Sequence, residues 1–299
     1  MPLDSVLFIG AGTMGAPMAR RLLAASVPLA VADPNPAARE AFEALGVPVA
    51  ASGDQLAGDV VITMVPTGAH VRAALLGPGG ALARPRRAVI DMSSSAPTPT
   101  VALARELGQR GLPMLDAPVS GGRAKALTGE LTTMVGGDPA VLERYRTLLG
   151  CMCTTILHVG PSGAGDTMKA LNNYLSGIAL LATCEALVVG AKAGLDPAVM
   201  IAAWQKSTGR NHTTEFKAPR SILPRTFDAG FASGLIAKDV GIAAGLAEEL
   251  GVAAPLLDAT RARWDAVRDA LGADADWTRA LTLVERDANF TLEAVPKEL

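Results

Sequence analysis

Blocks of apolar residues, separated by more polar segments, dominate the first half of the chain. These blocks have the length and composition of buried β-strands, and they lie at residues 6–9, 29–33, 59–65, 88–92, 114–119, 131–135 and 155–159. Segments with helical periodicity separate most of them. Strands that alternate with helices predict a parallel, doubly wound α/β sheet.

The pattern changes after Pro161, where apolar residues recur with the period of a helix. Asp196-Pro197 is a favourable start for one helix, because Asp caps the N-terminus and Pro fits the first turn. The predicted helices cover residues 165–193, a segment from 197, and residues 235–250, 255–271 and 276–288. We therefore expect two domains, residues 1–161 (α/β) and residues 162–299 (all-α), joined by the long helix.

The composition narrows the class of protein. Hydrophobic residues make up 49% of the 299 residues and aromatic residues only 4%, so the core consists mainly of Ala, Leu and Val. The net charge of -2 argues against nucleic acid or an anionic membrane as the main partner. The apolar run from Leu175 to Val189 contains Ser176, Thr183 and Glu185, and it is too short and too polar to be expected to span a bilayer.

Targeting and redox features point to the cytoplasm. Residues 1–6 have no basic region of the kind that opens a signal peptide. Cys151 and Cys153 have one residue between them, not the two of a metal or redox motif, and Cys184 stands alone. We expect three reduced thiols and no metal site.

A glycine-rich turn follows the first predicted strand and precedes a predicted helix. Its glycines allow a tight turn, close approach of the backbone to a pyrophosphate and close packing of the helix on the strand. The motif predicts a Rossmann domain that binds a dinucleotide; the alternative is a glycine turn without a ligand. The predicted contacts in this turn are Gly10, Ala11, Gly12, Thr13, Met14 and Gly15.

Asp33 ends the second predicted strand, near the spacing from Gly15 that is typical of a ribose-binding acid. Its carboxylate would accept hydrogen bonds from the adenine ribose hydroxyls and repel a 2′-phosphate, which favours NAD. NADP remains possible because Arg39 lies about one helical turn later. The alternative is that Asp33 only caps the helix after Pro34.

A hydroxyl and two glycines stand at the end of another predicted strand. Ser120 and the backbone amides of Gly121 and Gly122 could hold a carboxylate, although an ordinary helix cap has the same composition. Lys125 follows in the next helix. It could contact a second polar group of a substrate or be a solvated surface lysine.

Lys169 and Asn173 lie four residues apart in the long predicted helix, so they share one face. The lysine can exchange a proton, and the asparagine can orient a hydroxyl group. Proton uptake requires a neutral amine, whose pKa is lowered by burial or by a nearby cation such as Lys238. The alternative is a solvated surface lysine.

Four motifs in this order resemble the β-hydroxyacid dehydrogenase family, which includes the 3-hydroxyisobutyrate dehydrogenases. They span residues 8–239, and the helical remainder is similar in type and length. The motifs are Phe8-Ile-Gly10-Ala-Gly12-Thr-Met-Gly15-Ala-Pro-Met-Ala, Asp116-Ala-Pro-Val-Ser120-Gly121-Gly122, Gly163-x-Gly165-x-x-x-Lys169-x-x-Asn172-Asn173, and Lys238-Asp239.

The resemblance implies reversible NAD(P)-dependent interconversion of a small 3-hydroxy acid and its semialdehyde or 3-keto acid. It also implies a homodimer or homotetramer formed through the helical half. By matching position, Lys169 is the general acid/base and Ser120, Gly121 and Gly122 bind the substrate carboxylate. Asn173 binds substrate, and Lys238 reaches both cofactor and substrate. Further implied cofactor contacts are Val65, Pro66, His70 and Ser94.

Two alternatives remain. Imine reductases are related, but their members generally replace the catalytic lysine. A dinucleotide-binding protein without turnover would be expected to have lost Lys169, Asn173 or the Ser-Gly-Gly segment. The family usually has a small residue where Lys125 stands, and residues 207–216 lack the tryptophan that some relatives place near the substrate. Both departures leave the identity of the substrate open.

Overall fold

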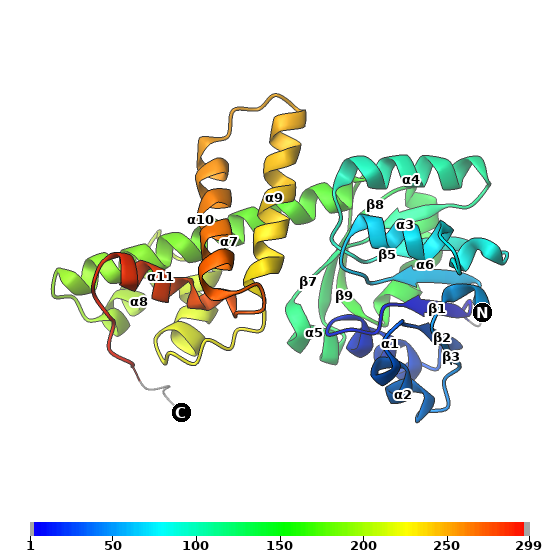
Figure 1. The fold of residues 1–299 in the computed structure, drawn as a ribbon, viewed down its shortest axis with the longest axis horizontal. Coiled ribbons are helices and arrows are strands. Elements are labelled where there is room, and N and C mark those ends of the chain that lie inside the picture. The colour runs from blue at the N-terminus through cyan, green and yellow to red at the C-terminus, as the bar shows by residue number, and fades with distance from the viewer. Residues whose placement is uncertain (1–2, 296–299) are drawn as a thin grey trace. The chain divides into compact units, whose positions relative to one another are not determined.

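The first half of the chain forms a nine-stranded sheet in the computed structural model, which describes residues 3–295 (Figure 1). The sheet has the order β3-β2-β1-β4-β5-β6-β8-β7, and β9 pairs with β8. The strands are β1 (Val6–Ile9), β2 (Leu29–Ala32), β3 (Val49–Ala50), β4 (Val60–Thr63), β5 (Ala88–Asp91), β6 (Met114–Asp116), β7 (Val119–Ser120), β8 (Leu131–Gly136) and β9 (Cys153–Gly160).

The strand order reverses beside β1. The chain passes from β1 outward to β2 and β3, and then returns to the other side of β1 to form β4. All pairings from β3 through to β6 are parallel. In such sheets the crevice outside the carboxyl ends of the two strands at the reversal is the usual ligand site.

Apolar cores cover both faces of the sheet, which explains the continuous apolar runs in the sequence. Successive side chains of a strand point to opposite faces. In β1, Val6 and Phe8 join one core, whereas Leu7 and Ile9 join the other. The same division separates Val60 and Ile62 of β4 from Val61, as expected for parallel strands that are buried on both sides.

Short helices connect these strands, and several begin at a side-chain cap. The Asn35 and Asp138 side chains accept hydrogen bonds from backbone N–H groups two residues later, and each is followed by Pro at the first helical position. The helices are α1 (Gly15–Ala24), α2 (Pro36–Glu43), α3 (Gly68–Leu76), α4 (Pro97–Gln109), α5 (Gly122–Thr128) and α6 (Pro139–Gly150), with 3-10 turns at Gly53–Gln55 and Ala81–Ala83.

The sheet differs from the predicted all-parallel arrangement at one edge. The run predicted as one strand at 114–119 is two strands, β6 and β7, and β8 is antiparallel to both. Only residues 121–130 connect β7 to β8. A parallel return needs a crossover of about a dozen residues or more, so this short connection brings the chain back antiparallel.

The second half of the chain is helical. α7 (Ala164–Lys192) contains the division between two compact units, one ending at Lys169 and the other beginning at Ala170. α9 and α10 form an antiparallel pair (Figure 1). The further elements are α8 (Pro197–Gln205), the π-helix η3 (Thr213–Ile222), α9 (Ser233–Glu249), α10 (Pro255–Leu271), the 3-10 turn η4 (Trp277–Arg279) and α11 (Ala280–Asp287).

Two features of this half differ from the sequence-based expectation. The polar segment before Ile222 forms a π-helix that contains Pro219. The helix predicted at 276–288 is divided into η4 and α11.

The long helix α7 lies where the sequence predicted a helix, at residues 165–193. With 29 residues it is long and apolar enough to cross a bilayer by length and composition, and 44% of its most apolar window is buried in the structure. The expectation of insufficient length was made for residues 175–189 and does not extend to the whole helix, which is longer. The core helix of a soluble protein has the same length and composition.

Candidate active site

The predicted cofactor residues of the sheet domain lie at the ends of four adjacent strands. The glycine turn follows β1, Asp33 follows β2, Val65 and Pro66 follow β4, and Ser94 follows β5. Because β2, β1, β4 and β5 are neighbours and parallel, their carboxyl ends form one edge of the sheet. The sequence positions that predicted a dinucleotide site are therefore brought together at the strand reversal.

The three glycines of the turn have different structural roles. Gly10 has φ +95°, and a Cβ atom there would lie 2.3 Å from the Met64 carbonyl oxygen. A Cβ atom on Gly15 would lie 1.8 Å from the Gly10 carbonyl oxygen. Gly12 is exposed, and a Cβ atom there would have no neighbour within 4 Å. The fold itself thus requires Gly10 and Gly15, whereas the packing of the protein places no such requirement on Gly12.

Asp33 connects the end of β2 to the glycine turn. One carboxylate oxygen accepts a hydrogen bond from the Ala11 N–H (2.7 Å), and the other accepts one from the Asn35 N–H (2.8 Å). An ionised carboxylate can accept about four hydrogen bonds, so acceptor capacity remains for ribose hydroxyls. The Arg39 guanidinium donates to the carbonyl oxygens of Asp33 (2.7 Å) and Pro34 (2.9 Å). The same turn therefore offers an acid that suits NAD and a cation that could meet a 2′-phosphate.

The loops after β4 and β5 are joined by a residue that the sequence did not indicate. The Val65 N–H donates to the Ser93 hydroxyl (2.9 Å), which fixes one loop against the other. His70 is exposed in the first turn of α3, and its Nδ1 lies 2.7 Å from the hydroxyl of Thr67, the N-cap of that helix. Ser94 is half-buried beside Ser93.

Buried acids hold the start of α7 against the sheet. Asp116, at the end of β6, accepts hydrogen bonds from the backbone N–H groups of Gly163 (2.8 Å) and Asp166 (3.1 Å). The Asp166 carboxyl in turn accepts from the Ser95 N–H (3.1 Å) and contacts the Thr100 hydroxyl (2.7 Å). The Gly163–Asn173 motif is therefore anchored by carboxyl groups as well as by its glycines.

These acids are too deeply buried for all of them to be ionised easily. Burial, together with the nearby acids Asp91 and Asp116, raises the pKa of Asp166 to about 8. Burial also raises the pKa of Asp116, against the opposing effect of its backbone donors. A protonated Asp166 can donate to the Thr100 hydroxyl, whose own proton can go to the Ala96 carbonyl oxygen (3.1 Å). The sequence signal for this cluster is an acid directly at the end of each of two buried strands, β5 and β6.

We expect Asp166→Asn to flatten the dependence of stability on pH. The folded pKa of about 8 exceeds the unfolded value near 4, so only the folded state holds this proton between those pH values. Stability contributed by this group is full below pH ~4 and is lost as pH rises to ~8, at up to about 1.4 kcal/mol per pH unit. Asparagine keeps an acceptor for Ser95 and a donor for Thr100, and it does not titrate.

The measurement is the free energy of unfolding in urea at pH 5 and pH 8 for both proteins. The free energy of unfolding of the variant, relative to that of the wild type, should be higher at pH 8 than at pH 5. If this difference is the same at both pH values, Asp166 does not hold a proton in the folded state over this range.

The predicted substrate residues of the sheet domain surround the β7–α5 turn and the start of α7. Ser120 is the half-buried last residue of β7, and Gly121 (φ +130°) and Gly122 (φ +65°) are exposed at the start of α5. Lys169 is only 9% exposed. A buried lysine is unlike the solvated surface residue that was the alternative. Lys125 is exposed, with its aliphatic chain against Gly121.

The second unit brings Asn173 and Lys238 together through Asp239. Asn173 Nδ2 donates to one carboxylate oxygen of Asp239 (2.6 Å), and Lys238 Nζ lies 3.1 Å from the other. Asn173 Oδ1 accepts from Asn172 Nδ2 (3.1 Å). The sequence suggested Lys238 by its motif, but the linking role of Asp239 depends on the packing of α7 against α9.

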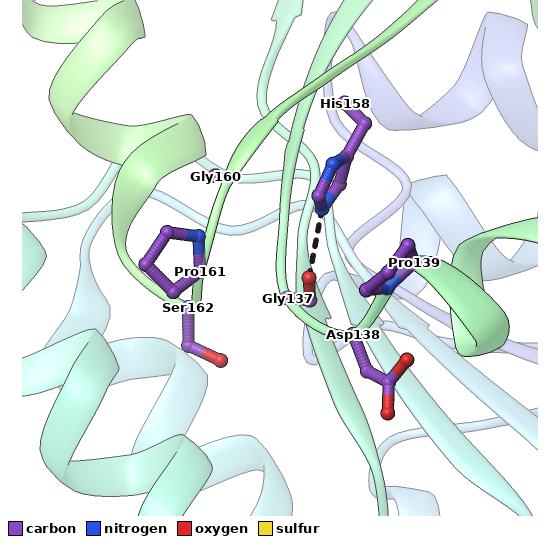
Figure 2. Close-up of a pocket in the computed structure, with 7 residues that line it drawn as sticks. All are labelled: Gly137, Asp138, Pro139, His158, Gly160, Pro161 and Ser162. Carbon is purple, nitrogen blue, oxygen red and sulfur yellow. Dashed lines mark hydrogen bonds between the residues drawn. The ribbon is translucent and has the colours of Figure 1, made fainter.

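A shallow pocket of about 460 Å³ lies apart from these residues. Figure 2 shows the His158 ring pointing to the Gly137 carbonyl oxygen, 2.9 Å away, where it ties β9 to the turn after β8. None of the residues predicted for cofactor or substrate lines this pocket. Its lining residues are Gly137, Asp138, Pro139, His158, Gly160, Pro161 and Ser162.

The two halves of the chain match two known protein families. Residues 5–160 match the family described as the NAD binding domain of 6-phosphogluconate dehydrogenase. Residues 163–284 match the one described as NAD-binding of NADP-dependent 3-hydroxyisobutyrate dehydrogenase.

Several individual proteins are similar over most of the chain. A 2-(hydroxymethyl)glutarate dehydrogenase of Eubacterium barkeri is 38% identical over 83% of this chain and 84% of its own length. An NAD-dependent L-serine dehydrogenase of Pseudomonas aeruginosa is 39% identical over 85% of this chain and 89% of its own. The structure of a Mycobacterium tuberculosis 3-hydroxyisobutyrate dehydrogenase with L-serine has a TM-score of 0.88 at 32% identity, covering 94% and 99% of the two chains. An imine reductase of Myxococcus stipitatus, at 18% identity and a TM-score of 0.62, shares the fold alone.

Proposed function

We propose, because this chain belongs to the β-hydroxyacid dehydrogenase family, that Lys169 is the general acid/base of an NAD(P)-dependent dehydrogenase of small 3-hydroxy acids. The reaction interconverts the hydroxy acid and its semialdehyde or 3-keto acid. The proposed role of Lys169 rests on the observation that this lysine is buried. It lies four residues before Asn173 on α7. Burial favours the neutral amine, which is the form that can accept the hydroxyl proton.

The other residues would bind and orient the substrate and the cofactor. Asn173 donates one N–H of its side-chain amide to Asp239. The second N–H of the same nitrogen can donate to the substrate hydroxyl group. The Ser120 hydroxyl and the N–H groups of Gly121 and Gly122 would hold the carboxylate. A bound nicotinamide supplies the acceptor for the hydride. The glycine turn, Asp33 and the loops after β4 and β5 would hold the cofactor, with NAD favoured and NADP possible.

The substrate class follows from the chemistry that the relatives share. 3-Hydroxyisobutyrate, L-serine and 2-(hydroxymethyl)glutarate are the compounds in the relatives' names, and each has a hydroxymethyl group on the carbon that bears a carboxylate. They differ only in the second substituent of that carbon. We propose that this protein oxidises the same hydroxymethyl unit.

The test is a panel of these three acids and 3-hydroxypropionate, each with NAD and with NADP, followed by the absorbance of the reduced cofactor. We expect turnover of at least one acid, and faster turnover with NAD. Faster NADPH-dependent reduction of a cyclic imine than oxidation of any acid would favour the imine reductase alternative. Cofactor binding without turnover of either kind would favour a non-catalytic role. A preference for NADP would contradict the interpretation that the Asp33 carboxylate favours NAD.

We also propose that the protein is a soluble, cytoplasmic homodimer or homotetramer. Large apolar side chains are exposed on the second unit, including Val189 (69%) on α7 and Val199 (65%) on α8. Large exposed apolar patches are typical of an interface between subunits, and we propose that these side chains contribute to one. Light scattering should give a multiple of the 30.6 kDa chain mass, and Val189→Glu should shift it toward the monomer. A wild type that is monomeric at micromolar concentration would contradict this proposal.

A further inference from the structure

Lys217 is a buried cation in the second unit that the reaction described above does not use. It lies in the π-helix η3, and only 7% of the residue is exposed. Lysine is almost never this deeply buried unless it is paired. Short π-helical segments also occur frequently at functional sites.

Hydroxyl groups and an aromatic ring surround the Lys217 ammonium. Nζ donates to the Ser176 hydroxyl (3.1 Å) and the Thr213 hydroxyl (3.5 Å), and it lies 4.2 Å from the centre of the Trp277 ring. Among residues 3–295, no carboxylate forms an ion pair with it. Burial lowers the pKa of Lys217 to about 8, so the amine is still mostly charged at neutral pH. Burial raises the pKa of the neighbouring Cys184, so that thiol stays neutral.

Two indole N–H groups lie in the same region. Trp264 is fully buried, and its ring stacks on that of Trp277 at 6.2 Å. Neither indole nitrogen has a hydrogen-bond acceptor within the described part of the chain. A Cβ atom on Gly177 would lie 2.8 Å from Trp264 Nε1, so this N–H lies directly over Gly177, next to Ser176.

This region therefore has more donors than acceptors. The Lys217 ammonium lies at Ser176 and the Trp264 N–H lies at the neighbouring Gly177, while the ring of Trp277 lies beside the ammonium. The oxygen atoms that accept from the ammonium belong to hydroxyl groups. Burying such donors without acceptors is unfavourable, most of all for a charged one. A ligand that brings a carboxylate would supply both the missing acceptors and the missing negative charge.

The position of Ser176 relative to Asn173 indicates how long such a ligand must be. Ser176 follows Asn173 by three residues on α7, which is a rise of about 4.5 Å along the helix axis. A substrate side chain of two methylene groups and a carboxylate spans a distance of this order. We propose that Lys217 determines specificity by binding a second carboxylate of the substrate, so that the preferred substrate is a dianionic 3-hydroxy acid. This inference rests on the proposed function, in which Asn173 holds the substrate hydroxyl group.

The test compares three acids that differ only in the second substituent. 2-(Hydroxymethyl)glutarate carries the distal carboxylate, 2-(hydroxymethyl)-5-methylhexanoate is its neutral isostere, and 3-hydroxyisobutyrate has only a methyl group. For the wild type we expect kcat/KM for the dianion to exceed that of the isostere by about 10- to 100-fold, the loss typical of a charge-assisted hydrogen bond. L-Serine should be poor, because it lacks the distal carboxylate and its ammonium group adds a second positive charge on the side of the substrate that faces Lys217.

Lys217→Met keeps the length of the side chain and removes its charge. It should raise KM for the dianion by about 10- to 100-fold, leave kcat nearly unchanged, and leave both monoanionic acids within about threefold of wild type. Lys206→Met is the matched control, because Lys206 is an exposed lysine of the same unit. It should change none of these values.

Several results would overturn the proposal. One is an equal loss for all three acids in Lys217→Met, which would assign a structural role to this lysine. Another is a wild type in which the dianion exceeds its isostere by less than about tenfold, and this ratio decides the matter if Lys217→Met does not fold.

Calorimetric titration of the NADH-bound protein with the same acids separates this inference from the proposed function. If no acid is oxidised but the dianion binds to the wild type and not to Lys217→Met, only the proposed function fails. If the acids are oxidised and Lys217→Met binds the dianion as the wild type does, only the carboxylate site fails.

Discussion

Lys169→Ala should abolish turnover while cofactor binding is retained. Lys169 is buried and lies in the motif that Asp116 anchors to the sheet, and proton transfer by such a positioned group contributes about 10²–10⁴-fold to the rate. A loss of kcat of at least this size is therefore expected. NADH affinity, measured by fluorescence titration, should remain close to that of the wild type.

Lys169→Arg distinguishes proton transfer from a purely electrostatic role. Arginine keeps the positive charge, but it does not lose its proton near neutral pH. It should therefore be as inactive as the alanine variant if the lysine exchanges a proton. Retention of more than about a tenth of the wild-type kcat in Lys169→Ala would exclude the assignment, since even a modest general base contributes more than that.

The second large effect is expected in the glycine turn, where two single-methyl substitutions should have opposite consequences. Gly15→Ala places a Cβ atom 1.8 Å from the Gly10 carbonyl oxygen, so the backbone must move and the protein should lose about 1–3 kcal/mol of stability or more. Gly12→Ala meets no atom within 4 Å, so its stability should stay within about 0.5 kcal/mol of wild type. Its methyl group would, however, occupy the space through which a pyrophosphate approaches the backbone.

Urea unfolding without cofactor and the dissociation constant for NAD together test this pair. Gly12→Ala should unfold like the wild type and bind NAD at least about tenfold more weakly, a loss of ~1.4 kcal/mol. Gly15→Ala should already be destabilised without any ligand. If Gly12→Ala binds NAD as tightly as the wild type, the turn does not contact the cofactor there.

The fold class was predictable because its determinants are local. Each central strand is a run of apolar residues buried on both faces, and the glycine turn after β1 marks the first strand–helix junction. The family resemblance was confirmed by matches to both halves of the chain. The domain limits at residues 161 and 162 and the roles of the individual site residues remain predictions.

Features that depend on distant contacts were not predictable. The antiparallel pairing of β8 with β6 joins two strands that are not consecutive in the chain. The raised pKa of Asp166 depends on its burial and on Asp91 and Asp116, which are far from it in sequence. The environment of Lys217 depends on residues from α7 and η4 that meet η3 only in the folded unit. The periodicity of a helix or strand does not indicate which distant residues will contact it in the folded protein.

We expect the two hydrogen bonds of Asp33 to restrict how the nucleotide preference of this enzyme can change during evolution or in the laboratory. Alanine at this position would remove a negative charge, but it would also leave the Ala11 and Asn35 N–H groups without their acceptor. Asparagine removes the same charge and keeps one carbonyl oxygen. Arg39 already lies beside the turn, so a cation for a 2′-phosphate need not be introduced. The accessible route toward NADP therefore keeps an acceptor at residue 33 and changes its charge, rather than removing the side chain.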